Sequence, residues 1–119
     1  IVDVYVVVRN EKQSKPFIQF SDWIRVLGNG ENIYYVCDSA NDRYPGALQY
    51  MLQNLPVTVT SMEEVSFEED AFYVMKSYLW DAEGSAVPEE CEIVMRLSSY
   101  VLVINKDQNL AKRWEPFRR

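Results

Sequence analysis

Aromatic side chains are the residues of this sequence best suited to binding chemistry. Its 119 residues include three Trp, eight Tyr and five Phe. Two groups stand beside breaks in the sequence pattern: Phe17, Phe20 and Trp23 in one, Tyr34 and Tyr35 in the other. Two flat rings that face each other hold a planar ligand, with about 1–3 kcal/mol per base stacked on a ring. A positively charged ligand ring adds a cation–π contribution of about 0.5–2 kcal/mol.

The pattern around these rings selects one pair. In a strand over residues 32–38, neighbouring side chains face opposite ways. Tyr34 and Tyr35 therefore cannot both face the core, and we expect one ring at the surface. Phe20 ends an extended segment just before a turn, so we expect it at a rim. With a carboxylate nearby to accept hydrogen bonds from a guanine edge, such a pair is typical of 7-methylguanosine recognition. The alternative, that the rings only cover a core, stays open.

Catalytic and metal-binding arrangements are poorly represented. The chain has no His, which removes the commonest general base and the commonest metal ligand. Cys37 and Cys91 form no CxxC motif, so no zinc site is expected, and we expect two reduced thiols. An acidic cluster lacks the ligand spacing of a calcium loop and indicates a solvated helix face; it comprises Glu63, Glu64, Glu68, Glu69 and Asp70. We predict no catalytic residue, no metal and no cofactor.

The charge balance limits the partners. The net charge of −6 disfavours wrapping a long nucleic acid, whose binding depends on Lys and Arg contacts to phosphates. It also disfavours anionic membranes, and no apolar run approaches the roughly 20 residues of a membrane helix. A short ligand held by its base remains compatible. Because the chain starts at Ile1 without Met, we expect a module excised from a longer protein.

The elements that position these residues follow from periodicity. Strands are predicted over 2–9 and 32–38, with an extended piece at 17–20. Residues 21–28 favour a helical turn capped by Ser21 and ended by a left-handed Gly28, with a strand as the alternative. A helix runs from Pro45 to about residue 54. A capping box from Ser61 to Glu64 predicts a second helix from residue 62, which would complete a helical hairpin.

The second half of the chain reads mainly as strands. Residues 71–80 are ambiguous, with aromatic and β-branched content favouring strand and the apolar spacing also fitting a helix. Residues 91–97 and 100–105 predict two strands, and Trp114 and Phe117 are expected to clamp the tail onto the body. We therefore predict a single α+β domain over 1–119, with a mixed or antiparallel sheet of about six or seven strands and an inserted α-helical hairpin.

This order of elements resembles a known family. The segments VDVYVVV, PFIQFSDW and NIYYVCD, followed by a helical hairpin and closing strands, resemble the cap-binding domain of the polymerase L protein of phlebovirus-type bunyaviruses. The resemblance rests on element order, module length and an aromatic pair. It implies that Phe20 and Tyr35 sandwich the methylated guanine, that Asp81 reads its edge, and that Arg25 and Arg43 approach the cap phosphates.

The resemblance also implies a biological role. The parent protein would be an RNA-directed RNA polymerase that takes caps from host messengers, with a separate endonuclease domain making the cut. This chain would supply binding alone, with capped RNA and the other polymerase domains as partners, in the host cytoplasm and the virion. The alternative from another class is a protein–protein interaction domain whose exposed aromatics dock a partner.

Overall fold

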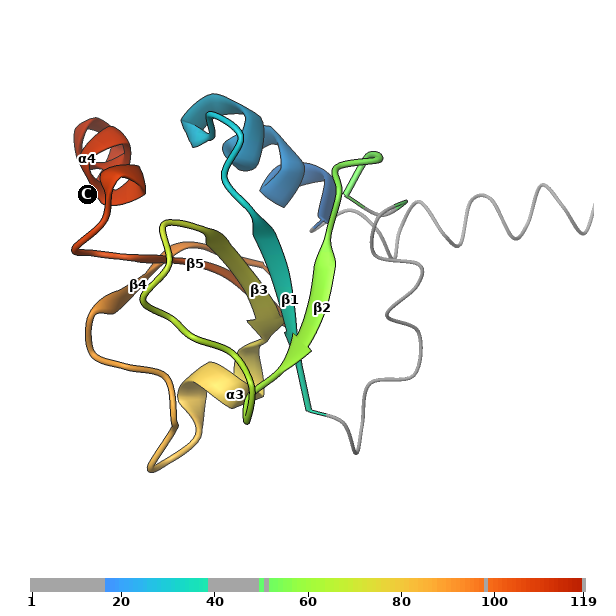
Figure 1. The fold of residues 1–119 in the computed structure, drawn as a ribbon, viewed down its shortest axis with the longest axis vertical. Helices are drawn as coiled ribbons and strands as arrows, with labels where there is room; N and C mark the ends of the chain where they lie inside the picture. The colour runs from blue at the N-terminus through green and yellow to red at the C-terminus, as the bar shows by residue number, and fades with distance from the viewer. Residues whose placement is uncertain (1–16, 39–49, 51, 98, 119) are drawn as a thin grey trace, which may run out of the picture.

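The computed structural model describes residues 17–38, 50, 52–97 and 99–118. Within them the chain forms one mixed five-stranded sheet of strand order β2-β1-β3-β5-β4 (Figure 1). The strands are β1 (Ile33–Cys37), β2 (Thr58–Ser61), β3 (Phe72–Lys76), β4 (Cys91–Leu97) and β5 (Tyr100–Asn105). β1 runs parallel to both β2 and β3, whereas β5 runs antiparallel to β3 and β4. The predicted α+β class is confirmed.

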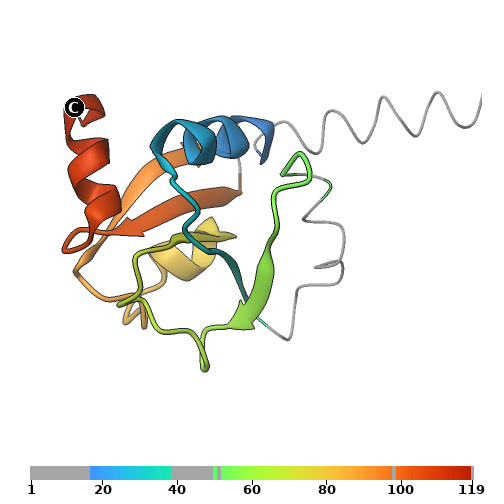
Figure 2. The same cartoon turned by 45° about the horizontal axis from the view of Figure 1, so that its top comes forward.

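Helices cover one face of this sheet and a short helix lies below the other. A helix over residues 17–27 lies beside α4 (Asn109–Trp114), which continues into the 3₁₀ turn η2 (Glu115–Phe117). Both lie above the sheet in Figures 1 and 2. On the other side, α3 (Ser77–Asp81) follows β3 directly. The described residues therefore form a helix layer, a sheet, and a second side covered by loops and α3.

The core between the sheet and the helix layer is rich in aromatic residues. Alternate residues of β3 and β5 point into it, as the strand period of two requires. Its buried members are Phe17, Phe20, Ile24, Leu27, Ile33, Tyr35, Leu52, Phe72, Val74, Val94, Leu102, Ile104, Leu110, Ala111 and Trp114. Helical spacing in residues 17–27 places four of these on one side of the helix. This packing fixes where the helix lies over the sheet.

A smaller core lies on the opposite face. It holds the other set of alternating strand residues together with the loop residues Phe67 and Ala71. Tyr73 is fully buried there, and its hydroxyl donates to the carbonyl oxygens of Ser66 at 2.9 Å and Glu69 at 3.1 Å. Burial raises the pKa of this phenol well above its ordinary value. The hydrogen bonds hold the loop after β2 against the sheet.

Three predictions are wrong for the helix over residues 17–27, called the N-terminal helix below. Residues 17–20 are helical and not extended, because Phe17 and Phe20 gain burial on the sheet at helical spacing. Ser21 lies inside the helix, where its hydroxyl donates to the Ile18 carbonyl at 2.7 Å, so it is no N-cap. Gly28 is not among the residues with positive φ. It is required instead by space, because a Cβ there would lie 2.5 Å from the Ile24 carbonyl oxygen.

The predicted helical hairpin is wrong in its second half. Residues 58–61 pair with β1 as the edge strand β2, and only one turn follows, in which the amides of Glu64 and Val65 both donate to the Ser61 carbonyl. The capping-box pattern therefore marks a turn, because the β-branched residues 58–60 and Ser61 itself pair with β1. Most of the first predicted helix, at 45–54, lies outside the described residues; its end is a turn with positive φ at Gln53 and Asn54.

The ambiguous segment contains both structures. Residues 72–76 form β3 and residues 77–81 form α3, so each alternative holds for half of it. The strands predicted at 32–38, 91–97 and 100–105 are confirmed. The strand predicted at 2–9 lies outside the described residues, so six or seven strands are not confirmed. Among the helices that the structure describes, none has the length and apolar character needed to cross a bilayer.

Candidate aromatic binding site

Phe20 and Tyr35 do not form a site open to solvent. The Phe20 ring is 0% exposed and the Tyr35 residue 3% exposed, and both belong to the core between the helix layer and the sheet. Phe20 contacts Phe17 edge-on at 5.9 Å. The two residues do lie on the same side of the sheet, but there they pack into the core and do not line a binding site. The expectation of a solvent-open slot between them is therefore wrong, because the helix over 17–27 closes over β1.

The other residues assigned from the resemblance lie apart. The Asp81 carboxylate, in α3, accepts hydrogen bonds from two guanidinium nitrogens of Arg96 at 2.7 and 2.8 Å. This pair lies on the side of the sheet away from Phe20. Hydrogen bonding to Arg96 holds the pKa of this exposed carboxyl below its ordinary value. Arg25 is exposed on the N-terminal helix and donates to the Gln53 carbonyl at 3.0 Å. Arg43 lies outside the described residues.

The alternation in β1 is confirmed, with the two tyrosines in the reverse roles from those assigned. Tyr35 faces the helix layer and Tyr34 faces the opposite side. Tyr34 lies stacked on Tyr73 at 5.7 Å, and its hydroxyl donates to Glu69. Hydrogen bonding to that carboxylate raises the pKa of Tyr34. Its partly exposed ring already has the Tyr73 ring on one face, so that face is closed to a ligand.

An aromatic hollow exists elsewhere, at the outer surface of the helix layer. A depression of about 250 Å³ opens to solvent between the N-terminal helix, β4 and η2. Its lining is mainly apolar, and consists of Gln19, Asp22, Trp23, Val26, Met95 and Phe117. The N-terminal helix supplies four of these lining residues, because positions 19, 22, 23 and 26 lie on one side of a helix. We call this depression the aromatic hollow.

The rings of the aromatic hollow are set edge to face. Phe117 lies 5.2 Å from Trp23 with 78° between the ring planes, and Trp23 lies 5.0 Å from Trp114 at 85°. Trp114 is 8% exposed and anchors both rings to the core. Phe117 is 46% exposed. Phe117 also lies nearly parallel to Trp114, at 6.1 Å and 24°, so the hollow brings Trp23 and Phe117 together edge to face and has no parallel pair among its lining rings.

Two polar side chains, Gln19 and Asp22, place hydrogen-bond acceptors beside the rings of the hollow. Asp22 is exposed and Gln19 is half-buried, and both lie within about one helical turn of Trp23. A carboxylate accepts hydrogen bonds from amino and imino groups, and an amide both donates and accepts. A flat ligand with positive charge and hydrogen-bond donors on its edge fits this combination. The hollow holds no nucleophile paired with a base.

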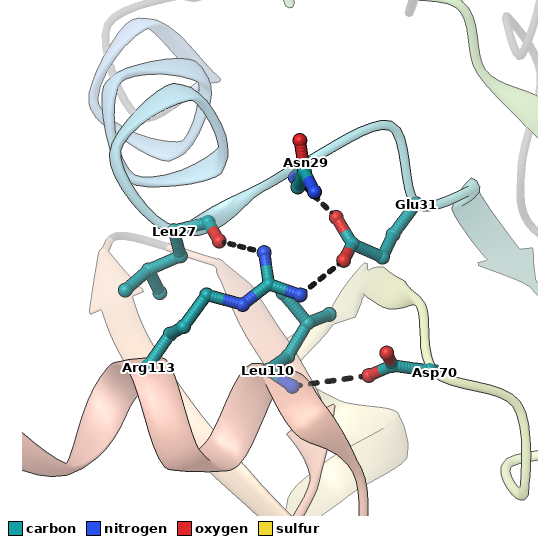
Figure 3. Close-up of polar contacts among 6 residues, drawn as sticks. All are labelled: Leu27, Asn29, Glu31, Asp70, Leu110 and Arg113. Atoms are coloured by element: carbon teal, nitrogen blue, oxygen red, sulfur yellow. Dashed lines mark hydrogen bonds and ion pairs between the residues drawn. The ribbon is translucent and has the colours of Figure 1, made fainter.

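Two ionic contacts fasten the walls of the hollow. Arg118 donates to Glu92 of β4 through two nitrogens, directly after Phe117. Arg113 of α4 donates to the Leu27 carbonyl at 2.6 Å and to Glu31 (Figure 3). Burial alone would raise the pKa of Glu31, but hydrogen bonds from Arg113 and the Asn29 amide bring that pKa below its ordinary value. The carboxylate is therefore charged at neutral pH.

Metal chemistry finds no support in the same region. Across residues 17–38, 50, 52–97 and 99–118, no three acidic or Cys side chains come together as ligands. Cys37 and Cys91 form no disulfide, as predicted, since they lie on opposite faces of the sheet and on strands that are not neighbours. Burial raises the pKa of the Cys91 thiol to about 11, so it is a poor nucleophile at neutral pH.

Comparison with known proteins adds no relative. No protein-family model matches the sequence, and neither the curated proteins nor the solved structures give a match. The resemblance to a viral cap-binding domain therefore stays a prediction. Sequence reasoning placed Trp23 in an aromatic group and expected the tail at Phe117 to clamp onto the body. It missed that these two residues meet, because they are 94 positions apart and only the helix layer joins them.

Proposed function

We propose that this chain is a binding module that recognises the 7-methylguanosine cap of RNA and carries no catalytic residues of its own. The observation that supports the proposal is the aromatic hollow, in which Trp23 and Phe117 meet solvent beside Asp22. N7-methylation gives guanine a positive charge, which favours stacking on an electron-rich indole or phenyl face. The ligand would then lie at this hollow and not between the buried rings of Phe20 and Tyr35.

Each group of the hollow has a role in this proposal. The exposed Phe117 ring stacks on one face of the base, and the Trp23 ring borders its edge. Asp22 accepts hydrogen bonds from the guanine imino and amino groups, which are donors on one edge. The chain's net charge of −6 suits a cationic base and disfavours plain RNA. Binding thus selects the methylated base over unmethylated guanine.

The wider role follows from the resemblance. The module would serve cap-snatching by a viral RNA-directed RNA polymerase, within a longer L protein whose other domains cut and extend the capped fragment. Its partners would be capped RNA and those domains, in the host cytoplasm and the virion. None of that machinery is needed for the binding experiment, which uses the chain as it stands.

The test is a titration of the chain with 7-methylguanosine triphosphate, followed by tryptophan emission. We expect quenching with the methylated nucleotide and a response at least ten times weaker with GTP. Phe117→Ala should weaken binding about 10- to 100-fold, because one base–ring stack contributes about 1–3 kcal/mol. Asp22→Asn should weaken the binding of both nucleotides, because each presents the same imino and amino edge to this carboxylate. Equal responses to both nucleotides would rule out cap recognition.

Tyr78→Ala is the matched control for Phe117→Ala. Tyr78 is 44% exposed, close to the 46% of Phe117, but it lies in α3 on the other side of the sheet. Its removal should leave the affinity for the methylated nucleotide unchanged. A loss of binding equal to that of Phe117→Ala would show that the effect is not located in the aromatic hollow.

The aliphatic side of the hollow favours one alternative, a protein–protein interaction domain. Val26, 61% exposed, and Met95 give the hollow an aliphatic side that suits a partner's apolar side chain. Such a domain would show no response to either nucleotide. The same Phe117→Ala variant would then lose its protein partner while ignoring cap analogue.

A further inference from the structure

We infer that Arg113 is a positioning residue for the aromatic hollow. The inference rests on the proposed function only in the choice of the ligand, a cap analogue, that binds the hollow. Arg113 lies outside the hollow, and its guanidinium bridges two separate segments (Figure 3). One nitrogen donates to the carbonyl of Leu27, at the end of the N-terminal helix, and another donates to Glu31 in the loop before β1. Because α4 continues into η2, the bridge joins the helix that carries Trp23 to the segment that carries Phe117.

The sequence distances explain why this bridge reaches the hollow. Leu27 lies four residues after Trp23, and Arg113 lies four residues before Phe117. Four helical residues span about 6 Å along the axis, so each end of the bridge lies about one turn from a ring. A change in the angle between the N-terminal helix and α4 therefore changes the distance between Trp23 and Phe117.

The surroundings of the bridge favour a fixed geometry. The Glu31 side chain is only 10% exposed, and the Arg113 side chain is 36% exposed. The planar guanidinium presents donors in a rigid fork, which holds two acceptors at a set angle. The other end of α4 is fixed separately, because the amide of Leu110 donates to Asp70 at 3.1 Å (Figure 3). Without Arg113, α4 keeps one of these two polar attachments.

The alternative explanation is that Arg113 only stabilises the fold. The two explanations differ in the folded protein, where a positioning residue changes the ring geometry and a purely stabilising one does not. The perpendicular Trp23 and Trp114 indoles, 5.0 Å apart, should give a far-ultraviolet exciton couplet. The third tryptophan, Trp80, packs against the core on the opposite face, so Trp80→Phe isolates this signal.

The experiment compares Arg113→Gln, Arg113→Lys and Glu31→Gln in the Trp80→Phe background, at temperatures where circular dichroism shows each variant folded. We expect Arg113→Gln to weaken the exciton couplet without ligand and to reduce the affinity for 7-methylguanosine triphosphate about tenfold. Arg113→Lys keeps the charge but loses the fork, so its couplet and affinity should be intermediate. Glu31→Gln should also weaken the couplet and the affinity, but by less than Arg113→Gln does.

The outcomes separate this inference from the proposed function. If the parent chain binds no cap analogue, the proposed function fails, while the couplet still tests the positioning. A folded Arg113→Gln chain with an unchanged couplet and affinity overturns the inference. If Arg113→Gln does not fold, Glu31→Gln decides: an unchanged couplet overturns the inference, and a weakened couplet supports it.

Discussion

Phe20→Ala distinguishes a core residue from a ligand-binding residue at one position. The sequence pattern places the Phe20 ring against a ligand, so its removal should abolish cap binding with little loss of stability. The structure leaves this side chain 0% exposed and in edge contact with Phe17 at 5.9 Å. A buried Phe→Ala change removes transfer free energy and leaves a cavity, which together cost about 3–5 kcal/mol. The two interpretations therefore predict opposite results.

The magnitude lies in the upper part of this range. The ring lies between the N-terminal helix and the sheet, both held by other core residues, so the cavity has little room to collapse. Loss of the aromatic pair with Phe17 adds about 0.5–1.5 kcal/mol. We expect the free energy of unfolding to fall by about 5 kcal/mol, a large share of the roughly 5–15 kcal/mol of a typical domain. Phe20→Leu should cost only about 1 kcal/mol.

The assay is equilibrium urea unfolding of each variant, followed by circular dichroism, with a cap-analogue titration of the same samples. A lower midpoint at unchanged slope reports lost stability. Phe117→Ala serves as the opposite case: at 46% exposure its change should cost well under 2 kcal/mol of stability while weakening ligand binding about 10- to 100-fold. If Phe20→Ala instead loses less than about 1 kcal/mol and abolishes cap binding, the ring faces the ligand, and the reasoning from burial is refuted.

Three further predictions address single contacts. Gly28→Ala should lower the free energy of unfolding by about 1–3 kcal/mol, because its Cβ would lie 2.5 Å from the Ile24 carbonyl oxygen; urea unfolding measures this. Asp81→Asn should leave both the urea midpoint and cap-analogue affinity unchanged, since its pair with Arg96 is exposed and α3 lies on the other face of the sheet from the hollow. Glu31 has a pKa below its ordinary value of 4.5 when folded, so its carboxylate stabilises the fold above that pH and loses this effect as the pH falls through the folded pKa. The stability difference between the parent chain and Glu31→Gln should therefore shrink on acidification, as measured by urea unfolding between neutral and acid pH.

Local sequence pattern predicted the parts of the fold whose partners are nearby or whose period is strong. β1, β4 and β5 have apolar, β-branched residues over strand length, and all three were predicted at nearly their observed bounds. The helix predicted from residue 62 is wrong, whereas the extended link predicted before it forms the strand β2 through pairing with β1, more than 20 residues away. Residues 17–20 were misassigned for a related reason: their burial on the sheet, invisible in a short window, favours helix.

The candidate site was harder to predict than the fold. Alternation in β1 correctly placed Tyr34 and Tyr35 on opposite faces, but it contains no information on which face the helix over 17–27 covers. That face is fixed by long-range packing of Phe20 and Trp114, so Tyr35 became the buried ring. The aromatic hollow joins residues 23, 95 and 117, a combination that no local motif encodes.

The same packing explains why a ligand can reach the hollow without any opening of the fold, whereas it cannot reach the core pair. A ring at 0% exposure contributes to a ligand only after the helix layer separates from the sheet, and that separation exposes the whole aromatic core at a cost comparable to unfolding. Phe117 meets solvent without any such opening and is fixed by its neighbours Trp114 and Arg118. A ligand at the hollow therefore binds a ring that is already in place, so little of its binding free energy is spent on ordering the protein.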